Sequence, residues 1–292
     1  MSVLKQVFAT PGRVAAVYRY LLHADGQEET RDRLEAVLSP TPLLGVKGTR
    51  EMVRGVVNEC VKMRLVEERD DHVRLHPELP PAARNRGAGP GRIGVTLADL
   101  LLRGNEENED FALVLAWYLD QDVRAAPGDW EAFSLAVDRE VGGDRLGLTS
   151  NDNPYNQFDD WACFLGFSWR QAHGKSFRLT PDPTQHLRWR LPEVFGRPGT
   201  RLAAASLADR LAQVCPVFEG GGFRREVDRR TGRRRERELS SVTAHAWFRL
   251  ADEGRVRVEQ SAGDAEVYLL PDGDGSVRCS AVTWISAAEV RP

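Results

Sequence analysis

Apolar residues in the first eighty positions recur at helical spacing and then alternate as they do in a strand. Thr10 and Pro11 suit the start of a helix, because the first helical position does not need the N–H that proline lacks. Val14, Val17 and Leu21 then follow at intervals of three or four residues. The elements expected here are a helix from residue 11, helices over 30–38 and 49–64, and a strand hairpin over 65–75. This order predicts a winged helix, with the hairpin as its wing.

One short phrase of alternating residues that stops at a proline occurs three times. It spans Val73 to Pro77, Phe177 to Pro181 and Val267 to Pro271, and the third copy has the weakest alternation. Each copy follows an apolar-periodic segment, a first strand and a turn, as the second half of a winged helix would. The repeat therefore predicts an α+β chain of three tandem winged-helix domains, expected at 1–80, 105–192 and 201–290.

Segments rich in proline, glycine and arginine separate these three expected domains. The first, 81–104, is predicted to be a linker and the second, 193–200, a hinge. The middle domain should contain helices near 109–121 and 129–141. In the third domain, a basic insertion at 224–238 interrupts the pattern.

Composition excludes several classes of protein. With 41% hydrophobic and 28% charged residues, the chain has the composition of an ordinary globular protein. Its net charge of −3 means that contact with nucleic acid would have to come from a local patch. Four widely spaced cysteines suggest buried thiols. Without a secretory signal or a long apolar run, the sequence predicts a cytoplasmic protein that makes no membrane contact.

The helix expected over 49–64 carries the first candidate DNA-binding residues. Opposite its apolar stripe lie Arg50, Arg54, Asn58 and Lys62, at intervals of four. On a recognition helix, arginine and lysine would reach phosphates or guanine edges, and asparagine can recognise adenine. A solvated polar face is the alternative interpretation, and Glu51 weakens the basic stripe.

The second candidate is the basic insertion, which holds eight arginines and four acids. Thr231 and Gly232 at its centre suggest a protruding hairpin or loop that would touch phosphates without recognising sequence. A self-neutralising charged loop is the alternative. Ser241, His245 and Arg249 repeat the interval of four on the helix that follows, where His245 and Arg249 are further candidates for DNA contact. The arginines expected to contact DNA in the insertion are Arg224, Arg225, Arg229, Arg230, Arg233, Arg234, Arg235 and Arg237.

The corresponding helix of the middle domain carries Asp159 and Asp160 instead. Acidic side chains repel phosphate, so this domain is expected to pack against its neighbours or a protein partner. Trp161, Trp169 and Trp189 are interpreted as core aromatics, with stacking on bases as the less favoured alternative.

No motif for catalysis is present. The chain lacks the GxxxxGK[ST], HExxH and GxSxG patterns, and its six histidines are dispersed. We therefore expect a protein that is not an enzyme, with no cofactor and no metal. Because aspartates and glutamates are abundant, a nuclease with an unfamiliar acidic site is the alternative.

The first hundred residues resemble the DpdG family. The resemblance rests on TPGRVAAVYRYLLHADGQ at the start of the chain and on MVRGVVNECVKMRLVEERDDHVRLHPEL from Met52 to Leu79. DpdG is a winged-helix component of a bacterial gene cluster that inserts 7-deazaguanine derivatives into DNA and restricts unmodified DNA. The resemblance implies a phage-defence accessory subunit that acts on double-stranded DNA with a helicase or nuclease partner. It implies no catalytic residues.

Two alternatives stay open beside a DNA-binding accessory subunit. Tandem winged helices also resemble the small subunits of condensin-like machines, where such domains bind a protein of the kleisin type. A transcription regulator is the other alternative, since a capped helix followed by a wing is common among regulators.

Overall fold

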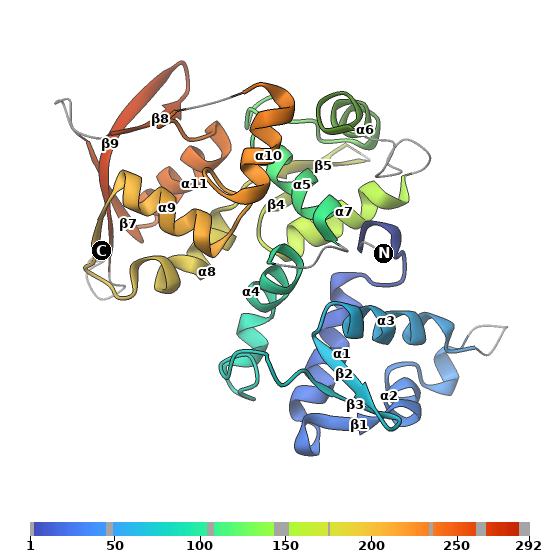
Figure 1. The fold of residues 1–292 in the computed structure, drawn as a ribbon. Helices are drawn as coiled ribbons and strands as arrows, with labels where there is room; N and C mark the ends of the chain where they lie inside the picture. The colour runs from blue at the N-terminus through green and yellow to red at the C-terminus, as the bar shows by residue number, and fades with distance from the viewer. Residues whose placement is uncertain are drawn as a thin grey trace.

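The computed structural model describes residues 3–44, 49–103, 108–142, 152–174, 176–233, 236–260 and 267–285. Helices predominate, and the strands form three small antiparallel sheets, which confirms the expected α+β class. The elements gather into a first unit near the N-terminus, a middle unit, and a third unit that ends the chain (Figure 1). None of the described helices is long and apolar enough to cross a bilayer.

The first unit alternates helices and strands in the order that the apolar pattern predicts. Its sheet has the order β1-β3-β2, with every pair antiparallel. The hairpin between β2 and β3 turns at Asp70 and Asp71, which both have positive φ, as a tight two-residue turn requires. The elements are α1 (Pro11–His23), β1 (Glu28–Thr30), α2 (Arg31–Leu38), α3 (Glu51–Lys62), β2 (Val66–Arg69) and β3 (His72–Leu75).

The apolar stripes seen in the sequence make the core of this unit. Val14, Val17 and Leu21 of α1 and Val57 of α3 are almost fully buried. The α1 helix begins at Pro11 as predicted, although the side chain of Thr10 makes no capping hydrogen bond. The sequence therefore predicted where these helices lie and which faces they bury.

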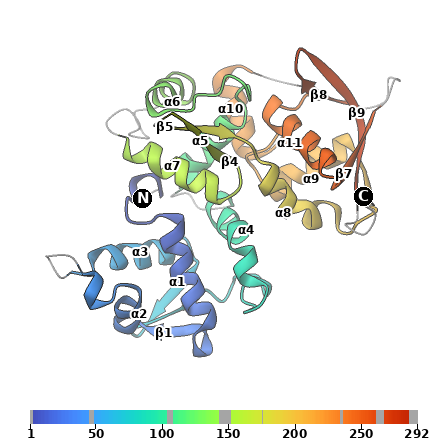
Figure 2. The same ribbon diagram turned by 180° about the vertical axis from the view of Figure 1, so that it is seen from behind.

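The predicted linker 81–104 is wrong for most of its length, because residues 89–102 form the helix α4 (Gly89–Leu102). Its glycines and proline suggested a loop, but the proline stands in the first turn, where a missing N–H costs nothing. Ile93, Leu97 and Leu101 then recur at intervals of four and are buried. This helix lies between the first unit and the rest of the molecule (Figure 2).

In its described residues, the middle unit has three α-helices, a π-helical turn and one two-stranded sheet. The backbone N–H of Leu179 in β5 also donates to the carbonyl oxygen of Gly128, 2.9 Å away, just before α6. In the first unit, β1 occupies the same position before α2 and pairs with β3. The elements are α5 (Glu109–Tyr118), α6 (Trp130–Val137), a π-helical turn (Asp138–Gly142), α7 (Asn153–Phe164), β4 (Ser168–His173) and β5 (Ser176–Pro181).

The third unit repeats the strand order of the first. Its sheet runs β6-β9-β7, and β8 is an additional strand paired with β9. The hinge predicted at 193–200 begins later than expected, because α8 continues through Pro192 and ends at Phe195. The elements are α8 (Thr184–Phe195), β6 (Arg201–Ala203), α9 (Ala204–Val214), α10 (Gly222–Thr231), α11 (Ser241–Asp252), β7 (Val256–Gln260), β8 (Tyr268–Asp272) and β9 (Gly275–Trp284).

The three copies of the repeated phrase do not occupy equivalent strands. Leu75 lies in β3, the central strand of its sheet, and Leu179 lies in β5. Leu269 lies in β8, and β9 is the one named strand with which β8 pairs in the described residues. The strand that corresponds to β3 is β9, because β9 is the central strand of its sheet. The third copy was therefore a wrong match, because a short alternating segment before a proline also suits a strand added at the side of a sheet.

The N-terminal residues join the first unit to the middle one. The indole N–H of Trp161 in α7 donates to the carbonyl oxygen of Ala9 at 3.2 Å. The backbone N–H of Val3 donates to Asn108 Oδ1 at 2.9 Å. Buried apolar residues from all three units form one connected core. The units therefore pack on one another.

Substitutions at two glycines of α4 test how this helix packs against α8. A Cβ at Gly94 would come within 2.6 Å of the Trp189 ring, whereas a Cβ at Gly91 would meet nothing within 4 Å. We expect Gly94→Ala to lower the free energy of unfolding by about 1–3 kcal/mol through overpacking. Gly91→Ala should raise it by about 0.5–1 kcal/mol through helix propensity. Urea unfolding of both variants measures this, and equal effects of one sign would contradict the packing.

Candidate nucleic-acid interface

The face predicted on α3 is exposed. The side chains of Arg54 and Lys62 are 62% and 41% exposed, and Asn58 is exposed between them. Arg50 directly precedes the helix, half-buried, and its Nε donates to the carbonyl oxygen of Ser39 at 3.2 Å. The structure therefore places Arg54, Asn58 and Lys62 on α3 and Arg50 at its N-terminal end.

Nearby carboxylates balance the charge of this face. Arg54 Nε lies 3.0 Å from Oε2 of Glu35, and Lys62 Nζ lies 2.5 Å from Oε1 of Glu59. Both glutamates are buried, so their positions are fixed by packing. The bond to Glu35 uses Nε of Arg54, while the side chain as a whole stays 62% exposed. The α3 face can thus present oriented donors, but it is not strongly positive.

Arg224 contradicts the prediction that it contacts DNA. Its side chain is 2% exposed and forms ion pairs with Asp120, Glu219 and Asp228. Burial alone would lower the pKa of its guanidinium, but the three carboxylates together outweigh this effect and raise it. Residues 222–231 form the helix α10, which packs on α5 (Figure 1), instead of a protruding arm.

Two arginines further along this segment also bind to groups of the protein itself. Arg230 donates to the carbonyl oxygen of Val141 at 2.5 Å, and Arg233 lies 3.1 Å from Oε2 of Glu140. Gly232 has φ +69° and ends the helix, so the predicted hairpin turn is a helix terminus.

The more exposed arginines of this segment form hydrogen bonds with residues that are near in the sequence. Arg229 and Arg230 both donate to Glu226, and these hydrogen bonds lower the pKa of Glu226 to about 2. Arg225 donates to the carbonyl oxygen of Gly220, and Arg237 is exposed. The expected phosphate contacts of Arg234 and Arg235 lie outside the described residues.

On α11, the predicted face turns toward the middle unit. Arg249 forms an ion pair with Asp182, and the hydroxyl of Ser241 accepts a hydrogen bond from the backbone N–H of Val123 at 3.0 Å. His245 is exposed between them. Two of these three positions are therefore used in contacts between the units.

The acidic face of α7 is occupied as well. Arg170 of β4 lies 2.8 Å from Oδ2 of Asp159 and also pairs with Asp160. The side-chain amide of Gln157 donates to the carbonyl oxygen of Val7 at 3.4 Å. Of the tryptophans predicted to be core, Trp161 is buried, whereas Trp169 is 44% exposed.

Sequence analysis missed a group of arginines on the outer face of the third sheet. Arg255 and Arg257 flank the buried Val256, so both point outward. Arg201 is 57% exposed and pairs with Glu259 at 2.8 Å. The alternation Arg-Val-Arg-Val-Glu at 255–259 was the signal that could have located them.

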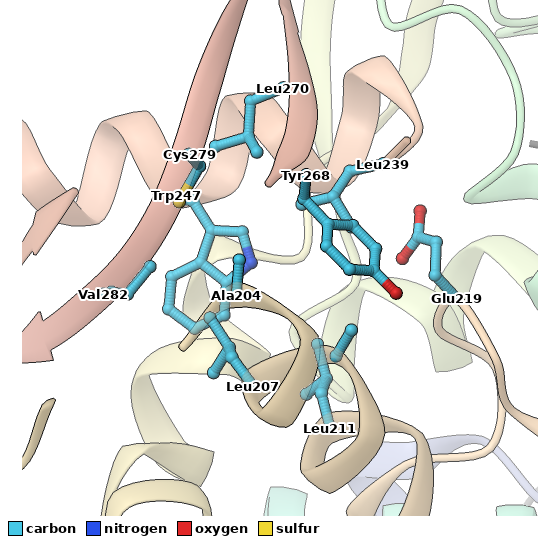
Figure 3. Close-up of a pocket in the computed structure, with 11 residues that line it drawn as sticks. Ala204, Leu207, Leu211, Glu219, Leu239, Trp247, Tyr268, Leu270, Cys279 and Val282 are labelled. Atoms are coloured by element: carbon cyan, nitrogen blue, oxygen red, sulfur yellow. The ribbon is translucent and has the colours of Figure 1, made fainter. Parts of the chain in front are cut away.

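The described residues line hollows of different size: one of about 410 Å³ beside Asn58 and Lys62 of α3, and one of about 580 Å³ beside Asp159 of α7. A cavity of about 20 Å³ between α9, α11 and the β8–β9 pair has room for about one water molecule (Figure 3). Trp247, Tyr268 and Leu211 lie around it, and Glu219 stands at one side. Within the described ranges, no group of three histidine, cysteine or acidic side chains is placed to hold a metal ion.

The fold and these surfaces define an α+β protein built of small units that each combine helices with an antiparallel sheet. Residues 1–265 match the model of the family described as DpdG-like, and the chain belongs to this family. The family is part of a multi-gene DNA-modification cluster. No curated protein matches the chain, and no solved structure matches it.

The buried position of Arg224 gives a test of its structural role. Arg224→Ala should lower the free energy of unfolding by about 3–5 kcal/mol, because the buried Asp120 loses its close partner and keeps the longer ion pair with Arg233, at 3.6 Å. Arg229→Ala is the matched control, since its side chain is 71% exposed and a solvent-screened surface pair such as that with Glu226 contributes little. Chemical denaturation measures both, and a loss in Arg224→Ala no larger than in the control would rule out this role.

Proposed function

We propose that this chain is a non-catalytic DNA-binding accessory subunit of the DNA-modification cluster, built from three winged-helix units. The first unit contacts the DNA bases through α3. The other two units pack together and support the first unit. Its partners are double-stranded DNA and the helicase- or nuclease-type subunits of the same system. The proposal rests on the arrangement of strands and helices, on the exposure of α3 and on the family.

The sheet order supports winged-helix units. In the first and third units, a short strand (β1 or β6) pairs with the last strand (β3 or β9), and so does the strand that follows the last helix (β2 after α3, β7 after α11). This is the arrangement expected when a hairpin after the recognition helix forms a wing. The middle unit keeps one hydrogen bond of that pattern, from Leu179 to Gly128.

The exposure of α3 carries the proposal. The three helices in the recognition position are α3, α7 and α11. Contacts with the N-terminal residues cover part of α7, and contacts with the middle unit involve α11. The outward donors of Arg54 and Lys62 on α3 remain exposed. A winged helix that reaches the major groove does so with this helix.

A protein-binding adaptor is the second candidate, and exposed apolar side chains favour it. Leu135 of α6 and Phe177 of β5 are each 68% exposed in the middle unit. Large exposed apolar side chains are typical of contact surfaces when they gather. An adaptor would bind duplex DNA weakly at every salt concentration, which separates it from the first proposal.

Titration of duplex DNA of mixed sequence, followed by fluorescence anisotropy, tests the proposal. Binding by the wild type should weaken steeply between about 50 and about 200 mM salt, as counterions return to the phosphates. In the variant Arg50→Ala/Arg54→Ala, the slope of log affinity against log salt should become shallower by about 2. Salt-independent weak binding by the wild type would favour the adaptor.

Arg33→Ala provides the control for lost charge. Arg33 lies on α2, its side chain is 72% exposed, and its partner is Glu29. Its removal should change neither the affinity nor the salt slope. Equal losses in Arg33→Ala and in the α3 variant would contradict a specific role for α3.

A further inference from the structure

The outer face of the third sheet brings arginines together from strands far apart in the sequence. Arg201 of β6 and Arg257 of β7 are both in register with Thr283 of β9, which lies between them. With neighbouring strands about 4.8 Å apart, the Cα atoms of these arginines are separated by about 10 Å. Arg255 lies two residues from Arg257 on the same face, about 7 Å along the strand.

This face is positively charged, unlike that of α3. Arg278 of β9 adds a further exposed arginine, and Glu259 is the one carboxylate in the sequences of β6, β7 and β9. Glu259 is held by Arg201 and accepts a hydrogen bond from the Thr283 hydroxyl at 3.0 Å. Its pKa is lowered, first by the hydrogen bond from Arg201, so it stays ionised.

Arg255 and Arg257 have no ion pair with any residue in the described part of the chain. Many other arginines of the described chain form an ion pair with a carboxylate. Examples are Arg31, Arg54, Arg170, Arg224 and Arg233. Arginines that are exposed and unpaired side by side repel each other, which costs stability unless a ligand supplies the opposite charge.

We propose that this arginine face, formed by Arg201, Arg255 and Arg257, is a second DNA-contacting surface that binds the phosphate backbone of duplex DNA. It rests on the proposed function and extends it, because it gives the third unit a contact of its own. Contacts to phosphate carry no sequence information, so the face binds without recognising sequence. Duplex DNA carries one negative charge for about every 1.7 Å of its axis, so arginines about 7–10 Å apart can each reach a different phosphate.

Two variants of the full chain with opposite charge changes test the surface. Arg255→Ala/Arg257→Ala removes two cations, so binding to mixed-sequence duplex DNA at about 50 mM salt should weaken by about tenfold or more, and the salt slope should fall by about 2. Glu259→Gln removes the single carboxylate and releases Arg201, so it should tighten binding and steepen the slope. The glutamine side-chain oxygen can still accept the bond from Thr283.

Arg19→Ala/Arg92→Ala is the matched control. These two arginines are exposed on α1 and α4 and also have no ion pair with described residues. The control should bind like the wild type, and all variants should keep the wild-type melting temperature because the substituted side chains are on the surface.

The outcomes separate this inference from the proposed function. Wild-type affinity and salt slope in both the arginine and the glutamate variants would overturn the arginine face while leaving DNA binding through α3 intact. That result is also the one expected if the face binds an acidic protein. Equal weakening in the arginine variant and the control would overturn it too. A wild-type chain without measurable affinity for duplex DNA would overturn both proposals.

Discussion

The buried ion pair between Arg224 and Asp120 determines how the rest of the molecule is assembled. The two side chains are 2% and 1% exposed and come from α10 and from the end of the α5 segment. Glu219 joins the same guanidinium and also accepts a hydrogen bond from the backbone N–H of Ser240, the residue that caps α11. One buried cation therefore connects the middle unit to the helix that follows the basic insertion. Removing Arg224 would take away the close cationic partner of Asp120 and of Glu219, two carboxylates that the fold keeps largely from solvent.

This assembly gives the three units different roles. The helix α10 packs on α5 of the middle unit. The following helix, α11, forms the ion pair between Arg249 and Asp182. The N-terminal residues similarly cover part of α7 through Trp161. The helices α7 and α11 are thus used in part for packing between units, whereas α3 stays exposed. Charge follows the same division, since Arg224 and Arg249 at unit contacts form ion pairs, whereas Arg255 and Arg257 beside the third sheet form none with the described residues.

Prediction from sequence succeeded where the physics is local. The spacing of Val14, Val17 and Leu21 fixed the buried face of α1, and the helix on 51–62 was expected from the same kind of pattern. The helix α4 was missed because glycine and proline composition outweighed an apolar periodicity that was present. Leu269 was misassigned because alternation in five residues does not reveal which strand is its neighbour.

The candidate site was harder to predict, for a reason that Arg224 illustrates. A dense run of arginines indicates exposure, but whether one of them is buried depends on Asp120, which is distant in sequence and placed by folding. The α3 residues were located correctly along their helix, whereas the carboxylates of Glu35 and Glu59 that balance them follow from packing. The arginine face could have been found from its alternation, which identifies an outward strand face.

The central claim is that α3 and the third sheet face DNA while α7 and α11 hold the units together. Backbone hydrogen exchange of the full chain, with and without duplex DNA, tests it most directly. The account predicts slower exchange on adding DNA in residues 51–62 and 255–259, and unchanged exchange in 153–164 and 241–252. Slower exchange confined to the α7 and α11 segments, with 51–62 unchanged, would contradict it.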